Sequence, residues 1–172
     1  MTEQAIMAEV GHLIPEARSI LSKEEIREKI LLFEDKLKMI PGSMIGDCFP
    51  LKHIFVDGAY VREITMPKGA LLTSKIHKVT HPYFVLKGEV SVLTEKGIQR
   101  IKAPYSGITP AGTKRILYIH EETVWTTVHV TKEKDLEKIE EEVIANSFDD
   151  LPELNPPDVQ NFIDVISKEE KC

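Results

Sequence analysis

The spacing of apolar residues changes along the chain, and the first pattern, which follows Ser22, is that of a helix. An apolar residue recurs every three to four positions, which places the series on one helical face. The series is Ile26, Ile30, Phe33, Leu37 and Ile40. Ser22 and Glu25 have the spacing of a capping box, and Pro41-Gly42 predicts the end of the helix. We therefore expect residues 1–45 to form an N-terminal helical arm.

Beyond Gly46 the period of the apolar pattern falls to two, which is the period of β-strands. Turn signals such as Asp57-Gly58 and Glu95-Lys96-Gly97 interrupt this pattern at spacings of roughly 8–12 residues. We expect strands at 53–56, 60–65, 71–75, 83–86, 90–93, 98–101, 107–109, 115–120 and 124–131. Many short strands at such intervals are typical of a β-sandwich or barrel, so residues 46–131 are predicted to form one.

The helical period returns after residue 131. Residues 132–146 carry an apolar stripe, a proline-rich linker is expected at 147–157, and a short amphipathic helix follows near Phe162. We expect residues 132–172 to be C-terminal helices and a tail. Their apolar stripes need a partner surface, either on the barrel of the same chain or on a second chain.

Charge and composition exclude several classes of function. The chain has 172 residues and a formal net charge of −6, and its lysines are mixed with glutamates. A nucleic-acid partner is therefore not expected, because phosphate binding needs a basic surface. No apolar run reaches the roughly 18 residues of a membrane span. The first residues do not resemble a signal peptide, and Cys48 and Cys172 form no CxxC pair, which favours a cytoplasmic protein without a thiolate zinc site.

Two histidines are the main candidates for chemistry. His77 and His81 are four residues apart in an extended segment, and even spacing on a strand puts side chains on one face. Two imidazoles on one face can share a transition-metal ion. His129 is the first choice for a third ligand because it shares the face of Trp125, and His120 is the alternative. The competing interpretation is a polar pocket of hydrogen-bonded histidines without an ion.

A second set of candidates is cationic. If Lys75 and Arg115 both point into the barrel, they form a pocket that favours a carboxylate or a phosphate. Tyr83 lies two residues after His81 on the same face and could add a hydroxyl. The alternative is that both cations reach solvent at the barrel mouth. Glu63 is either an inward acid or an exposed residue.

The segment from about residue 50 to 131 resembles the cupin superfamily, the RmlC-like jelly-roll proteins. The first cupin motif runs from a Gly through His-x-His and Glu to a second Gly, and Gly69 and Gly88 fit its two ends. The second motif contains Gly and Pro-x-Gly-x-x-His, and Gly107, Pro110 and Gly112 fit it. The resemblance implies a double-stranded β-helix barrel that often holds one metal ion and often forms dimers.

The ligand positions of the cupin motifs are filled differently here. His77 fits the second histidine of the first motif, and His81 stands at its glutamate position. Lys75 stands at the first histidine position, and Arg115 at the histidine of the second motif. Two cations beside a divalent ion would oppose its binding. The layout also resembles small cupin-like proteins encoded by bacteriophages, which would imply a place in the host cytoplasm or the virion.

Three hypotheses for the function follow. The first is a binding protein whose histidine-bearing, partly cationic pocket holds a small polar or anionic ligand, with or without a divalent Zn, Fe, Ni or Mn ion. The second is a metal-dependent enzyme of the cupin type, a dioxygenase or a sugar isomerase, that uses His77, His81 and His129. The third is a phage-encoded assembly protein with a vestigial pocket. In each case we expect a homo-oligomer, most simply a dimer.

Overall fold

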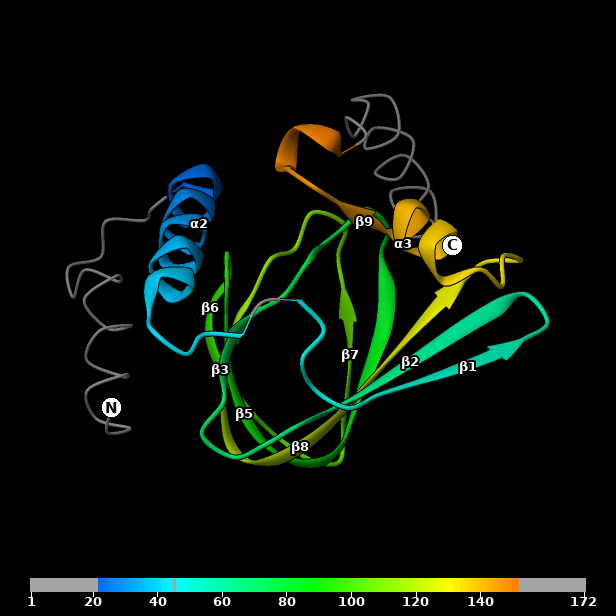
Figure 1. Ribbon diagram of the computed structural model, residues 1–172, viewed down its shortest axis with the longest axis horizontal. Helices are drawn as coiled ribbons and strands as arrows, with labels where there is room; N and C mark the ends of the chain where they lie inside the picture. The colour runs from blue at the N-terminus through cyan, green and yellow to red at the C-terminus, as the bar shows by residue number, and fades with distance from the viewer. Residues whose placement is uncertain (1–21, 45, 152–172) are drawn as a thin grey trace, which may run out of the picture.

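The computed structural model describes residues 22–44 and 46–151 (Figure 1). The arm before Ser22 and the amphipathic helix expected near Phe162 lie outside these ranges. Among the described residues, none of the helices is long and apolar enough to span a bilayer.

The predicted N-terminal helix is confirmed as α2 (Lys23–Met39). Ser22 caps it, and the reciprocal capping box with Glu25 is present. The helix buries Ile30 and Phe33 against Leu93 and Ile116 of the barrel, and it therefore stands beside one wall (Figure 1).

The barrel is a seven-stranded antiparallel sheet whose main order is β1-β2-β8-β5-β6, with β3 on β8 and β7 on β5. Its strands are β1 (Leu51–Val56), β2 (Ala59–Met66), β3 (Leu71–Thr73), β5 (His81–Thr94), β6 (Gly97–Lys102), β7 (Tyr105–Thr109) and β8 (Ile116–Val130). The expected fold class is confirmed: the protein is mainly β, with helices on both sides of the barrel in sequence.

Two of the expected strand breaks are wrong, because β5 and β8 each run through what the sequence divided into two strands. The break expected at Gly88 is a bulge, where the pairing of β5 with β8 shifts register. Gly88 has φ +88°, and a Cβ there would lie 2.2 Å from the carbonyl oxygen of Glu122. The bulge bends β5 so that its first half pairs with β7 and its second half with β6.

Alternation along the strands decides which side chains fill the barrel. Its buried apolar residues are Met66, Tyr83, Val85, Val90, Val92, Ile101, Leu117, Ile119 and Trp125. On β8 this alternation continues from Trp125 through Thr127 to His129, so the interior changes from apolar to polar toward one end of the barrel.

The second predicted helix is shorter than the sequence indicates. The helix α3 (Leu136–Val143) is capped at its N-terminus by Asp135, whose carboxylate accepts from two backbone amides. The chain then forms β9 (Ile144–Ala145), which pairs with β4 (Ile76–His77) in a separate two-stranded sheet. A 3-10 turn at Phe148–Asp150 follows where an extended linker was expected. In Figure 1, α3 and β9 lie across one end of the barrel.

Candidate metal site

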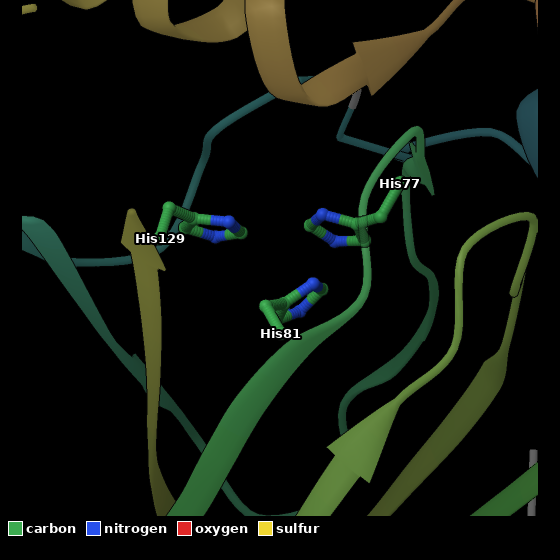
Figure 2. A group of neighbouring side chains, drawn as sticks. All are labelled: His77, His81 and His129. Atoms are coloured by element: carbon green, nitrogen blue, oxygen red, sulfur yellow. The ribbon is translucent and has the colours of Figure 1, made fainter. Parts of the chain in front are cut away.

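Three histidine side chains meet at the end of the barrel that α3 and β9 cover (Figure 2). The ring centroid of His81 lies 4.3 Å from that of His77 and 4.4 Å from that of His129. The rings of His77 and His129 lie 5.5 Å apart. One ring nitrogen from each residue lies within 4.8 Å of the other two, which is a spacing that one metal ion can span.

The structure brings His77 and His81 together by a different route from the one expected. They do not share a strand: His77 ends β4, His81 begins β5, and a turn separates them. The carbonyl of His77 accepts a 2.8 Å hydrogen bond from the amide of Gly112, in the Pro-Ala-Gly turn of the second motif. The two motifs thus hold each other in place at this site.

The ring nitrogens of the three histidines lack hydrogen-bond partners on the side where the rings face one another. His77 Nδ1, His81 Nε2 and His129 Nδ1 are buried and find no partner within the described ranges. His81 Nδ1 donates to the carbonyl of Val79 at 3.0 Å, which leaves a lone pair on its Nε2. A buried polar atom without a partner costs on the order of 1–3 kcal/mol, so three in one cluster indicate a ligand-binding role.

The three imidazoles are neutral at pH 7. The pKa of His77 is lowered from 6.5 to about 2, first by burial and then by neighbouring His81 and His129. The pKa of His129 is lowered to about 4 by burial, by His81 and by Arg62. Burial also lowers the pKa of His81, although its hydrogen bond to Val79 acts in the opposite direction. Metal binding requires neutral imidazole, and all three histidine side chains at this site are in that form.

Arg115 lies inside the barrel beside this cluster. Its guanidinium stands over the rings of Tyr83, at 5.1 Å, and Trp125, at 5.6 Å. Its Nη2 donates to Thr109 Oγ1 at 2.5 Å, and Thr109 is paired with His81 across β5 and β7. The residue is 6% exposed, and no carboxylate in the described part of the chain forms an ion pair with it. Burial lowers its pKa, as expected for a cation removed from water.

Lys75 does not join Arg115 in the barrel, contrary to the two-cation pocket considered from the sequence. Its side chain is 41% exposed and its ammonium pairs with Glu140 and, at 3.5 Å, with Asp47. The strand β3 ends at Thr73 and β4 begins at Ile76, so the alternation that would have turned Lys75 inward is interrupted. Of the two cations considered from the sequence, Arg115 alone lies inside the barrel.

The other candidates lie away from the cluster. His120 contacts Ser91 Oγ at 2.7 Å through Nε2 and meets the ring of Tyr118, which packs on the side of α2. The carboxylate of Glu63 accepts from Thr126 Oγ1 at 3.4 Å. Neither residue is part of the histidine cluster.

Arg62 was missed by the sequence analysis. It lies on β2 between Tyr60 and Ile64, which both contribute to buried clusters, and its charge lowers the pKa of His77 and His129. Its Nη2 pairs with Asp47 at 2.8 Å. The signal was present in the sequence, because Arg62 has the same parity on its strand as the buried Tyr60 and the partly buried Ile64.

No protein-family model and no curated protein matches the chain. Among solved structures, the chain is similar to a cupin-2 domain protein from Shewanella frigidimarina, with 10% identity over 58% of this chain and 92% of that one, at a TM-score of 0.41.

It is also similar to an RmlC-like cupin with a double-stranded β-helix fold from Methanocaldococcus jannaschii. The identity is 13% over 54% of this chain and 88% of that one, at a TM-score of 0.42. A third similar structure is that of an acetylacetone dioxygenase from Acinetobacter johnsonii, with 17% identity over 53% of this chain and 65% of that one, at a TM-score of 0.42. The first two of these three proteins are described as cupins, the family that the sequence motifs resemble.

Proposed function

We propose that this chain binds one divalent transition metal through His77, His81 and His129, and that the metal holds a small polar or anionic ligand at its open positions. The observation that supports this most is the convergence of three buried ring nitrogens that lack hydrogen-bond partners. Three protein ligands with further positions open are typical of metal sites that bind a second molecule. An all-imidazole set suits Zn, Fe or Ni better than Mn, which favours oxygen ligands.

The charges around the site favour an anion as that ligand. Three neutral imidazoles leave the charge of a divalent ion uncompensated, and Arg115 adds a buried positive charge that has no carboxylate partner among the described residues. Buried charges are stable only when they are paired, so a carboxylate or hydroxide at the metal is favoured over a neutral ligand. The guanidinium of Arg115 can hold a carboxylate with two parallel hydrogen bonds, and Tyr83 lies beside it.

Metal titration of the full chain tests the proposal. Protein purified without a histidine tag and stripped with a chelator should bind about one equivalent of Zn²⁺ or Co²⁺ in calorimetry and elemental analysis. His81→Ala and His129→Ala should each weaken binding by at least about tenfold. His120→Gln, which changes another histidine of β8, serves as the control and should bind as the wild type does. Uptake below about a tenth of an equivalent would contradict the proposal.

The same site would serve the alternative of a metal-dependent enzyme. Open metal positions beside a buried guanidinium favour binding and polarising an anionic substrate. Turnover by the metal-loaded protein of a small carboxylate or keto acid, lost in His129→Ala, would distinguish an enzyme from a binding protein.

A further inference from the structure

We infer that residues 136–145, which form α3 and β9, are a lid that belongs to the metal site, so that metal binding and closure of the lid are coupled. The inference rests on the proposed metal site and concerns its regulation. It starts from the fact that the three histidines do not belong to one sheet.

Two of the histidines are on the barrel and the third is on the lid side. His81 and His129 lie on β5 and β8 of the seven-stranded sheet. His77 lies on β4, whose strand partner is β9: Ile76 pairs with Ala145, and His77 with Ile144. A metal ion held by all three residues would therefore connect the two sheets.

The residues next to His77 are also bound to the lid. The amide of Lys78 donates to the carbonyl of Val143 at 2.8 Å, and its ammonium donates to the carbonyl of Glu141 at 2.8 Å. On the other side of His77, the ammonium of Lys75 pairs with Glu140. The bond from Gly112 to the carbonyl of His77 ties the same segment to a barrel turn, so β4 is a link between lid and barrel.

The lid itself rests on a small contact with the barrel. Ile139 and Val143 are buried against Tyr60 of β2, with Ile144 at the edge of this cluster. The ring of Tyr60 lies 6.2 Å from that of His129, its pairing partner on β8. In Figure 2 the lid passes above the three rings. A helix as short as α3 is not stable by itself, so the lid stays closed only through such contacts.

A metal ion that uses His77 adds a strong contact of this kind. It binds the closed form, in which His77 faces His81 and His129, more tightly than a form with β4 and β9 displaced. By linkage, the metal stabilises the closed lid, and a stable lid raises the affinity for the metal by the same factor.

Hydrogen exchange of the full chain with and without one equivalent of Zn²⁺ tests the coupling. Peptides that cover 136–145 and the amide of Lys78 should exchange at least about tenfold more slowly with zinc. The β6 strand is the internal control and should not change. In His77→Gln, zinc still held by His81 and His129 should no longer protect the lid. Zinc binding that leaves lid exchange unchanged in the wild type would overturn the inference while the metal site stands, whereas an absence of zinc binding would overturn both.

A change in the lid tests the reverse direction. Ile139→Ala removes part of the contact with Tyr60 and changes none of the three histidine ligands. It should lower the zinc affinity about tenfold. Glu140→Gln, which removes only the exposed ion pair with Lys75, should have a smaller effect in the same direction. Wild-type zinc affinity in Ile139→Ala, together with faster lid exchange, would overturn the coupling.

Discussion

Arg115 is a cation enclosed by two aromatic rings and one hydroxyl, and these contacts explain how its charge is tolerated inside the barrel. The π faces of Tyr83 and Trp125 and the oxygen of Thr109 compensate part of the cost of burial. They do not neutralise the charge. The residue is therefore suited to a bound anion rather than to direct contact with a metal ion.

Removal of this charge should affect anion binding more than metal binding. In the Co²⁺-loaded protein, Arg115→Gln should weaken acetate binding by about tenfold or more, measured from the visible spectrum of cobalt. Arg115→Lys should restore only part of the affinity, because an ammonium cannot form two parallel bonds. The exposed Arg100→Gln is the matched control. Equal acetate affinities in Arg115→Gln and the wild type would contradict the assignment.

The histidine cluster should make the metal-free protein less stable in mild acid. In the unfolded chain these imidazoles take up protons below about pH 6.5, but folded His129 does so only near pH 4 and His77 near pH 2. Between pH 6.5 and 4 the unfolded state thus binds more protons, and stability rises with pH. At pH 5 we expect a loss of roughly 1–2 kcal/mol per histidine relative to pH 7, measured by urea unfolding.

The comparison variant for this experiment is His129→Gln, which removes one of the two groups. Its stability should depend less steeply on pH across the same range. Parallel curves for the variant and the wild type would mean that His129 does not titrate as described.

The prediction of single site residues from the sequence depended on the alternation of side chains along each expected strand. His129 was chosen because it alternates with Trp125, and the structure places it in the cluster. Lys75 was chosen for its position in the first motif, at the end of a strand expected over 71–75, but that strand ends at Thr73. The pairing of His77 with Ile144 joins positions far apart in the sequence, and no local pattern indicates such a contact.

At the scale of secondary-structure elements, a bulge within a strand was harder to predict from the sequence than the start of a helix. The capping box of α2 is a local signal, and it marked the start of the helix correctly. The glycine at position 88 is equally local, but a bulge within a strand and a turn between two strands give the same pattern of residues. Only the partner strand β8, which passes beside both halves of β5, distinguishes them.

Gly88→Ala should test how tightly the bulge is packed. The added Cβ would meet Glu122 O at 2.2 Å and Thr123 Oγ1 at 2.7 Å, in a backbone with positive φ. We expect a loss of about 2–4 kcal/mol in the free energy of unfolding. Gly97 also has a positive φ, +102°, but a Cβ added there would meet nothing within 4 Å. Gly97→Ala should therefore lower the free energy of unfolding by only about 1 kcal/mol, from the backbone conformation alone. Similar losses in both variants would show that crowding at the bulge is unimportant.

At the scale of the whole molecule, the helices among the described residues leave part of the outer barrel wall uncovered. On the outward side of β5 and β7, Phe84 is 37% and Ile108 is 62% exposed. Apolar residues grouped on an exposed face are typical of surfaces that bind another protein. The dimer expected from the sequence stays a prediction, and this wall is the surface we assign to it.

Sedimentation of two charge variants can test that assignment. Ile108→Glu should convert a dimer to a monomer, because the interface would have to bury a carboxylate. Ile98→Glu, at a 48% exposed position on β6, should leave the dimer unchanged. A wild-type protein that is monomeric at all concentrations would contradict the expected dimer and weaken the suggested role in phage assembly.

The division of the histidines between two sheets also has a consequence for how the protein is made. Residues reach the folding chain in order from the N-terminus, so β4, β5 and β8 are synthesised before β9. A nascent chain that has just completed β8 already has all three histidines, but not the strand that holds His77 in place. Tight metal capture would then begin only after residue 145 has emerged, and this order would protect an unfinished barrel from trapping an ion in the wrong geometry.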